Sequence, residues 1–392
     1  MQKVGSETML SEIPAQVRIY RTTACEPSLK YLEKEREFGQ RNWLARMIVE
    51  LFGGARRWTF RSVLLPDRMV TWLPFAVKRG RQIVRDEGID VIFATCPPHS
   101  VTLVGAFLKL LTGKPLILDF RDDWIDTPWH SSKPKIIRQI MRLIESFVVR
   151  NADRIVLVTE WSRNAFLRRY PTLSRKKFVF IPNGFDPEDL VVLNSLKVVP
   201  NKDKFTVLYA GSLNVSKSWG RNPVGLFQAV HKIIQQQPDL EEKLALVFTG
   251  DFPDEYQRLA EKMGLCGVIN RLGNLPHDKV LRLIKSADLL VAVNYEGWST
   301  LIPAKIYEYW AVGGPPILLL SCPGAASELV ERYGLGLTVD PFDISGIIQA
   351  ILMIYRQSKT ATPLRLKTAG IEEYDRQTLT RKLAQVLSIV CS

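Results

Sequence analysis

The sequence lacks the cysteine pattern of a zinc or disulfide protein. Its five cysteines are scattered and form no CxxC pair: Cys25, Cys96, Cys266, Cys322 and Cys391. This spacing argues against a zinc site and a disulfide framework, and it favours a reducing, cytoplasmic setting. There is also no uninterrupted apolar run of about 18 residues and no apolar core of signal-peptide length at the amino terminus. We therefore expect neither a membrane-spanning helix nor secretion.

Several catalytic signatures are missing as well. The sequence contains no GxxxxGK[ST], GxGxxG, HExxH or GxSxG motif. Its four histidines are far apart in the chain: His99, His130, His231 and His277. These absences disfavour a P-loop NTPase, a simple dehydrogenase, a zinc protease and an α/β-hydrolase.

Acidic residues are outnumbered, and the 392 residues carry a formal net charge of +13. The stretch Arg41–Arg85 holds ten basic and two acidic residues, with Trp43, Trp58 and Trp72 among them. Such a stretch is typical of a surface that meets an anionic membrane; the alternative is a solvated face of an ordinary basic protein. Nucleic acid is not an expected partner, because no recognisable nucleic-acid module accompanies the charge.

What the chain does contain is alternation of short apolar runs with amphipathic ones, from about residue 88 onward. In the first series, strands are predicted at 90–95, 115–120, 154–159 and 177–186, and helices at 100–113, 135–152 and 161–170. A second series predicts strands at 205–213, 244–250, 268–274, 288–294, 316–321 and 336–340, and helices at 223–237, 254–264, 277–287 and 325–334. Alternation at this spacing indicates parallel, doubly wound sheets.

The predicted fold class is therefore α/β, with two doubly wound, Rossmann-like domains facing a cleft. The segment 186–204 lacks clean periodicity and is the predicted linker. Before the first series we expect a strand at 15–23 and a basic helical segment at 25–58. Ligands of such sheets bind beyond the carboxyl ends of the strands, so candidate site residues are those that directly follow strands.

Polar residues follow two strands of the first series. Asp119, Arg121, Asp122 and Trp124 end or follow the second strand. Four such residues cannot all be core, which favours a functional site over the alternative of a local ion pair with a helix cap. His99 follows the preceding strand and is a candidate substrate contact, with a structural histidine as the alternative.

In the second series, small and polar residues end two strands. Gly211 and Ser212 open a loop that also contains Lys217 and Arg221. Small residues let the backbone approach a phosphate, and cations neutralise it. The sequence TGD ends the next strand, where Gly250 permits close approach of a base or ribose.

The stretch Ser299–Pro316 is predicted to begin a helix with charged residues in its first turns. Pro303 suits a first turn, and the unpaired N–H groups beside it form an anion site together with the helix dipole. Lys305 adds positive charge, and Glu308 lies where a carboxylate accepts two hydrogen bonds from a ribose diol. The alternative is a surface pair of Lys305 with Glu308.

Eight segments between residues 88 and 340 carry a family resemblance: ATCPPHS, LDFRDDW, VTEWSRNAFLRRY, IPNGFD, LYAGSL, FTGD, SADLLVAVN and IPAKIYEYWAVGGPPIL. In this order they resemble the nucleotide-sugar glycosyltransferases of the GT-B fold, in particular retaining family 4 (glycosyl transferases group 1). DFRDDW and IPAKIYEY look most like bacterial members that build surface polysaccharides. The family opens with a strand and a glycine-rich loop, which we expect this chain to lack.

The resemblance implies roles for individual residues. Glu308 matches the second glutamate of the family's E-x7-E motif, which binds the donor ribose, whereas Thr300 stands in place of the first. Arg221 and Lys305 match the cations that face the diphosphate. The implied donor-binding residues are Gly211, Ser212, Arg221, Gly250, Asp251, Asn294, Thr300, Ile302, Pro303, Lys305 and Glu308. The implied acceptor-side and catalytic residues are Asp119, Arg121, Asp122 and His99.

The resemblance implies a retaining glycosyltransferase that needs neither metal ion nor cofactor. Its donor is a nucleoside-diphosphate sugar and its acceptor is a glycan or a lipid-linked glycan, on the cytoplasmic side of a membrane. The predicted domains are an acceptor-side domain at 1–190, a donor domain at 200–370 and a helix at 371–392 that crosses back. Two alternatives are a sugar-nucleotide 2-epimerase and a catalytically impaired partner of a polysaccharide assembly.

Overall fold

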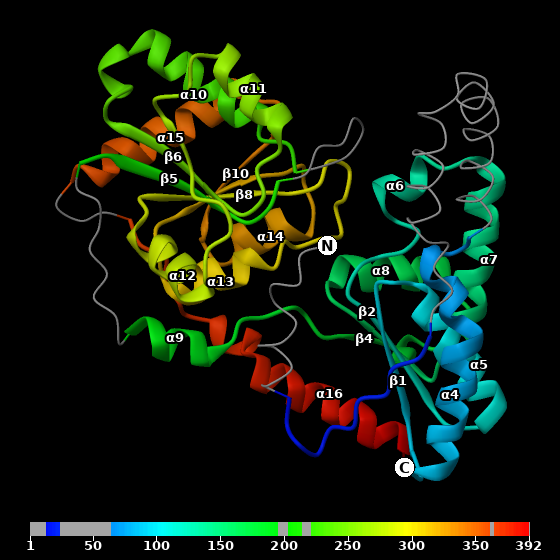
Figure 1. The fold of residues 1–392 in the computed structure, drawn as a ribbon. Coiled ribbons are helices and arrows are strands. Elements are labelled where there is room, and N and C mark those ends of the chain that lie inside the picture. Colours follow the sequence, from blue (N-terminus) through cyan, green and yellow to red (C-terminus); the bar gives the residue numbers. More distant parts are fainter. Residues whose placement is uncertain (1–12, 24–63, 195–202, 214–220, 361–363, 392) are drawn as a thin grey trace, which may run out of the picture. The chain divides into compact units, whose positions relative to one another are not determined.

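The computed structural model describes residues 13–23, 64–194, 203–213, 221–360 and 364–391 (Figure 1). By its contacts the chain forms two compact units, Met1–Asp90 with Pro98–Lys114, and Val91–Pro97 with Pro115–Ser392. The helical segment predicted at 25–58 lies outside the described residues. No helix within the described ranges has both the length and the apolar character needed to cross a bilayer.

The smaller unit contains the short helix η1 (Arg68–Trp72) and the helices α4 (Leu73–Asp86) and α5 (Ser100–Thr112). Asp67 joins η1 to α5, because its carboxylate accepts the N–H of Met69 at 2.9 Å and the N–H of Ser100 at 2.8 Å. Helix α5 ends at Gly113, whose φ of +70° is the left-handed cap that the sequence predicts.

The strand predicted at 15–23 is wrong, because this segment forms no strand. The segment is held in place by side-chain contacts and not by the backbone hydrogen bonds of a sheet. Tyr20 donates to Glu87 at 2.8 Å, and Arg18 forms an ion pair with the same carboxylate. Alternation in a short segment indicates an extended chain, but a strand also needs a neighbouring strand to receive its hydrogen bonds.

The first sheet of the larger unit has four parallel strands in the order β1-β2-β3-β4. Its strands are β1 (Ile92–Cys96), β2 (Leu116–Phe120), β3 (Arg154–Leu157) and β4 (Phe178–Phe180). All five residues of β2 are buried. These are the four strands predicted in the first series, with boundaries that move by a few residues.

The helices of this part are α6 (Pro128–Ser131), α7 (Lys135–Asn151), α8 (Glu160–Arg169) and the carboxy-terminal α16 (Arg376–Cys391). Helix α16 packs on the first sheet: Leu379 and Val386 belong to one buried cluster with Ile117, Val156 and Ile181. The far end of the chain therefore contributes to the core of the first sheet.

The second sheet has six parallel strands in the order β10-β9-β8-β5-β6-β7. The strands are β5 (Phe205–Ala210), β6 (Leu244–Thr249), β7 (Ile269–Arg271), β8 (Leu289–Val293), β9 (Ile317–Leu320) and β10 (Gly336–Val339). The order reverses between β5 and β8, because the chain winds outward from β5 on one side and from β8 on the other. This reversal marks the switch point at which doubly wound sheets bind ligands.

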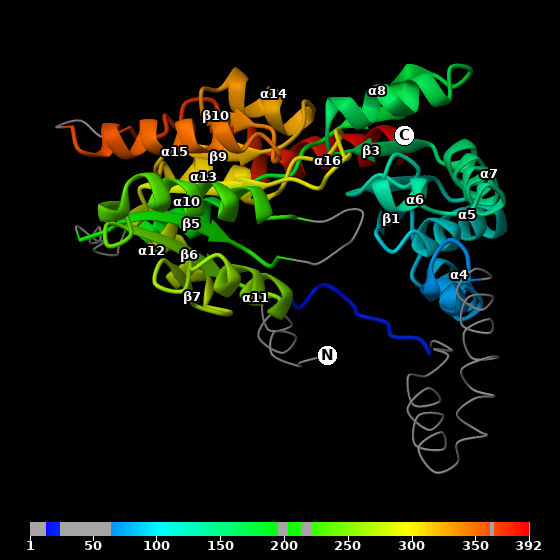
Figure 2. The same cartoon turned by 90° about the horizontal axis from the view of Figure 1, so that it is seen from above.

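Helices cover both faces of the second sheet (Figures 1 and 2). One face carries α10 (Val224–Gln236), α11 (Asp254–Lys262) and α15 (Ile344–Ser358), and the other carries α12 (His277–Ser286), α13 (Lys305–Val312) and α14 (Ala325–Arg332). Successive strand residues enter opposite cores: Val207 and Tyr209 pack under α10, and Leu208 and Ala210 under α13. Burial on both faces explains why these strands are continuous apolar runs.

The predicted linker begins as a helix, α9 (Pro187–Asn194), which packs against α12 and α13. Three short 3-10 helices complete the described elements: η2 (Arg175–Lys177), η3 (Pro238–Leu240) and η4 (Ile371–Tyr374).

Helix α13 is anchored by Trp310, whose side chain is fully buried. Its Nε1 donates to the carbonyl of Lys367 at 2.9 Å, and its ring lies 4.4 Å from Tyr333 and 5.4 Å from Tyr374 between centroids. Trp310 thus ties the helix to the segment that leads into α16.

We predict that Trp310→Ala lowers the free energy of unfolding by about 3–5 kcal/mol, because it empties a large buried site and orphans the Lys367 carbonyl. Urea unfolding measures this loss. The control is Met353→Ala on α15, whose side chain is 42% exposed and whose loss should cost about 0.5 kcal/mol or less. A loss below about 1 kcal/mol for Trp310→Ala would contradict the anchoring role.

Candidate functional site

The candidate site lies at the carboxyl ends of β5 and β8, where the strand order of the second sheet reverses. Gly211 follows β5, and Asn294 follows β8. The loop after β8 leads directly into α13, so the beginning of α13 reaches the same edge of the sheet.

Two glycines permit this convergence. Gly211 has a φ of +136° and Gly250, after β6, a φ of +98°, both unfavourable for other residues. A Cβ on Gly250 would lie 2.6 Å from the carbonyl carbon of Gly211. A Cβ on Gly211 would lie 2.7 Å from Nζ of Lys305, the first residue of α13. Both positions therefore require glycine, as the sequence predicts for a backbone that approaches a ligand.

Side chains tie the loops after β5, β6 and β7 to one another. Ser212 donates to the carboxylate of Asp251 at 3.3 Å and accepts the N–H of Asp251 at 3.2 Å. Asn274 donates its amide to the other oxygen of Asp251 at 3.2 Å. Ser212 and Asp251, both predicted as site residues, lie together, and Asn274 is a partner that the sequence reasoning missed.

The side-chain nitrogen of Lys305 is buried, and it has no hydrogen-bond partner within the described part of the chain. Nζ lies 3.6 Å from the centroid of the Tyr209 ring. Burial, and next the charge of Arg221, lower the pKa of Lys305 well below its usual value. A buried ammonium without an anion is costly, so an anionic ligand would complete this arrangement.

Arg221 is the second cation of the site. Its guanidinium lies 4.9 Å from the Tyr295 ring centroid, and its charge acts on the nearby Lys305. Lys217, the other cation of this loop, lies outside the described residues. Two of the cations predicted to face a diphosphate are therefore close to each other.

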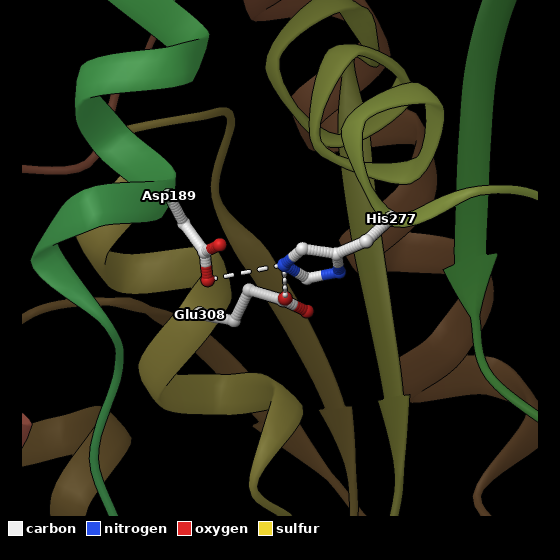
Figure 3. Close-up of side chains that lie close together, drawn as sticks. All are labelled: Asp189, His277 and Glu308. Atoms are coloured by element: carbon white, nitrogen blue, oxygen red, sulfur yellow. Dashed lines mark ion pairs between the residues drawn. The ribbon is translucent and has the colours of Figure 1, made fainter. Parts of the chain in front are cut away.

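Glu308 lies one turn further along α13 and does not pair with Lys305, so the surface-pair alternative is wrong. Its neighbour is His277, whose Nε2 lies 3.6 Å from Oε1 of Glu308 and 3.0 Å from Oδ2 of Asp189 (Figure 3). Burial raises the pKa of Glu308, while the charge of His277 opposes this rise. The sequence reasoning missed both neighbours, although His277 opens a helix shortly after β7, a position that the strand-end rule covers.

Within the described residues, three side chains form a group that could hold a metal ion: Asp189, His277 and Glu308. Their possible ligand atoms all lie within 4.8 Å of one another. In this structure they form an ion-pair cluster, with the 3.0 Å contact of His277 to Asp189 as its shortest separation. The positive charges of Lys305 and Arg376 also act on Glu308.

The remaining donor-side residues shape the approach to α13. Asn294 donates its amide to the Leu301 carbonyl and to the Ser321 hydroxyl, both at 3.3 Å, so it fixes the loop after β8. Ile302 and Pro303 are buried at the start of the helix.

Thr300, which stands where the family motif has its first glutamate, donates its hydroxyl to Asp123. The Thr300 carbonyl accepts the hydroxyl of Thr159 at 2.7 Å. Asp123 is buried and also accepts from Ser162 at 3.0 Å. Burial raises the pKa of Asp123, and these two hydroxyl donors oppose the rise. Asp123 is a further residue that the sequence reasoning did not single out.

The predicted site residues at the end of β2 differ in how deeply they are buried. Asp119 is buried and accepts from the Thr95 hydroxyl at 2.9 Å and from Nε of Arg121 at 2.8 Å, which is the local ion pair held open as the alternative. Trp124 is buried in the core. Asp122 is half-buried, and its pKa is raised by burial and by Asp123 and lowered by Arg221.

His99 lies in the smaller unit, at the position that precedes α5. It is buried, and burial lowers its pKa to about 4. His99 is therefore neutral at physiological pH and can donate or accept a hydrogen bond there without carrying charge.

A pocket of about 340 Å³ opens beside Arg121 and the residue before α13. It is lined by Arg121, Asn183, Ala304, Arg376 and apolar residues of β3 and α16. Two arginines and an amide give this pocket hydrogen-bond donors, and its other lining residues are mostly apolar. That combination suits a polyhydroxylated or anionic ligand.

Two family models match the chain. The glycosyl transferase 4-like domain matches residues 38–184, and the glycosyl transferases group 1 model matches residues 194–372. No curated protein matches the chain by sequence.

Solved structures share the fold. A sucrose-phosphate synthase from Thermosynechococcus elongatus is 16% identical, with a TM-score of 0.59 over 82% of this chain and 79% of that one. The Anabaena protein HepE in complex with UDP is 21% identical, with a TM-score of 0.58 over 80% and 81%. The lipopolysaccharide outer core galactosyltransferase WaaB is 14% identical, with a TM-score of 0.55 over 80% and 79%. These likenesses show two Rossmann-like domains of the GT-B fold.

We predict that Lys305→Met stabilises the ligand-free protein. Because the folded-state pKa of Lys305 lies below its unfolded value, the unfolded chain binds more protons, and wild-type stability rises with pH between the two values. Methionine removes the buried amine and the cost of desolvating it, so at pH 7 the free energy of unfolding should increase by about 1–3 kcal/mol.

Urea unfolding at pH 7 and at pH 9.5 measures both effects. The rise of stability with pH should be smaller in Lys305→Met than in the wild type. The control is Lys262→Met on α11, an exposed lysine whose replacement should leave the pH dependence unchanged. A less stable Lys305→Met would show that Nζ is satisfied in the ligand-free protein.

Proposed function

The chain belongs to the GT-B nucleotide-sugar glycosyltransferases of the glycosyl transferases group 1 family, and from this membership we propose its reaction. It transfers a sugar from a nucleoside-diphosphate sugar, with retention of anomeric configuration, to a glycan or lipid-linked acceptor in the synthesis of a bacterial surface polysaccharide. The observation that carries the proposal is the buried Nζ of Lys305, which has no hydrogen-bond partner within the described part of the chain. It lies against Gly211 at the start of the helix that bears Glu308.

The diphosphate of the donor binds at the start of α13. There Lys305 supplies the missing counter-charge, and the helix dipole favours an anion. Gly211 and Gly250 leave room for phosphate oxygens against the backbone. Arg221, whose charge acts on Lys305, neutralises the second phosphate.

The ribose of the donor binds Glu308. Glu308 is three residues from Lys305 on the same helix, an advance of about 4.5 Å along the axis, which suits the spacing from a diphosphate to its ribose. An ionised carboxylate accepts the hydrogens of both ribose hydroxyls.

Charge stabilisation drives the chemistry. As the bond between the sugar and the diphosphate breaks, negative charge builds on the leaving phosphate, and Lys305 and Arg221 stabilise it from fixed positions. As the family resemblance implies, the leaving phosphate takes the proton of the acceptor hydroxyl. The reaction uses no cofactor and no metal ion.

The acceptor binds on the side of the first sheet. We propose the division into an acceptor domain at 1–190, a donor domain at 200–370 and a crossing helix at 371–392. The pocket beside Arg121 and Ala304 supports this placement, because it adjoins the start of α13. Asp119 orients Arg121 through their 2.8 Å ion pair, and Asp122 is a further polar group for the acceptor. In the smaller unit, His99 is a proposed substrate contact.

Glu308→Ala is expected to raise the donor KM about tenfold or more, because two hydrogen bonds to a charged acceptor are lost. Steady-state assays with UDP-sugars and GDP-sugars in EDTA test the ribose contact and the metal-independent reaction together. The control is Glu331→Ala, an exposed glutamate on α14, which should leave the donor KM unchanged. An unchanged KM for Glu308→Ala would refute the ribose assignment.

We further propose that the protein meets the cytoplasmic face of an anionic membrane. Most of Arg41–Arg85 lies outside the described residues, but its last part forms α4. There a pocket of about 480 Å³ is lined by Lys78, Arg81 and Arg85 together with Leu111, which is 50% exposed. Cations beside an exposed apolar side chain suit anionic headgroups over acyl chains.

Charge reversal on α4 is expected to weaken binding to vesicles that contain phosphatidylglycerol. Lys78→Glu with Arg81→Glu should lower the bound fraction about tenfold or more, since each headgroup contact is worth about 1 kcal/mol. Vesicle sedimentation measures this fraction. The matched control, Arg258→Glu with Lys262→Glu on α11, makes the same change of charge. An equal loss in both double variants would indicate a non-specific effect of net charge and contradict the α4 surface.

A further inference from the structure

We propose that His277 is a positioning residue for the donor: fixed by Asp189, it holds Glu308 as an oriented, ionised acceptor for the ribose. The inference rests on the proposed role of Glu308 and adds two residues to it. Figure 3 shows the three side chains pointing toward one another from three helices, α9, α12 and α13.

The two distances at Nε2 of His277 assign different roles to its neighbours. The 3.0 Å separation from Oδ2 of Asp189 is the shorter ion pair, so Asp189 is the carboxylate that holds the ring in place. The 3.6 Å separation from Oε1 of Glu308 is too long for a hydrogen bond, so the imidazole acts on Glu308 through its charge and through contact.

The packing of the helices keeps this arrangement in place. Helix α9 contacts both α12 and α13, and α12 contacts α13. His277 is the first residue of α12, directly after Pro276, so its backbone is fixed at the helix start. The side chains of Glu308 and Asp189 are 28% and 35% exposed, which leaves Glu308 partly accessible to a ligand.

Four charged or titratable groups act on Glu308. His277 on α12, Lys305 on α13 and Arg376 at the start of α16 lower its pKa, and Asp189 on α9 raises it. Burial raises its pKa more than any of these groups changes it, and His277 is the largest opposing influence. A ribose diol donates hydrogens, so it needs Glu308 ionised. His277 thus supports the state of Glu308 that binds the donor.

From this geometry we expect substitutions at His277 and at Asp189 to shift the pH dependence of donor binding in opposite directions. As the pH falls, Glu308 becomes protonated and donor binding is lost. Without His277, which favours ionised Glu308, this loss should begin at a higher pH than in the wild type. Without the charge of Asp189, which disfavours ionised Glu308, the loss should begin at a lower pH. A structural role alone would move both variants in the same direction.

The experiment measures UDP affinity by calorimetry from pH 5 to pH 8 for the wild type, His277→Asn and Asp189→Asn. At pH 6, His277→Asn should bind UDP about tenfold more weakly, with kcat at saturating donor within about twofold of the wild type. Asp278→Asn is the matched control: it is the next residue of α12, is half-exposed and faces Arg282, and should leave the pH profile unchanged. The inference is overturned if both variants shift the profile in the same direction, or if neither shifts it.

A second measurement needs no nucleotide. The titration of Glu308 in the ligand-free protein is followed by carbon-13 NMR of labelled glutamate carboxyls, with Glu308→Gln used for assignment. The midpoint should rise in His277→Asn and fall in Asp189→Asn; unchanged midpoints overturn the inference. If the midpoints shift as expected but the wild type binds neither UDP nor GDP, the proposed function fails and the claim of donor positioning is overturned with it.

Discussion

The candidate site depends on one steric constraint, the close approach of three chain segments at the switch point of the second sheet. Gly211 and Gly250 touch through their backbones, and Nζ of Lys305 lies against Gly211. A Cβ on Gly250 would collide with the backbone of residues 211 and 212, and the positive φ of Gly211 disfavours any other residue there. Nζ of Lys305 is buried there over the face of Tyr209, and no residue that the structure describes offers it an acceptor. The proposed diphosphate would supply this missing partner.

Helix α13, which carries Lys305 and Glu308, is fixed to the second sheet by buried aromatic side chains. Trp310 and Tyr309 are both fully buried on this helix. The hydroxyl of Tyr309 accepts the N–H of Ala210 at 3.0 Å and donates to the Val291 carbonyl at 3.4 Å, so it joins the helix to β5 and β8. Lys305 and Glu308 therefore keep a fixed spacing relative to the strand ends. Preorganised groups of this kind stabilise developing charge without first having to reorganise.

Carboxylates near the site are balanced by neighbours from distant parts of the sequence. Glu308 is flanked by His277 and Asp189, and the Thr300 hydroxyl donates to Asp123. The sequence motif has no glutamate at position 300, yet a carboxylate lies beside that position in space. A motif read along the chain reports one element at a time, whereas the electrostatics of a site sums over every element packed against it.

The sequence by itself determined the local structure of this protein. Continuous apolar runs between helical periods located all ten strands of the described residues. Glycines at strand ends predicted a close backbone approach, which Gly211 and Gly250 show, while the phosphate-binding role of this loop stays a prediction. Only the tertiary structure decided which of these elements touch. It showed that residues 15–23 have no strand partner, that α9 begins the expected linker, and that Asp189 and His277 lie beside Glu308. The physical reason is that periodicity records whether a residue is buried, whereas the identity of its neighbours depends on strand order and helix packing across long separations in the chain.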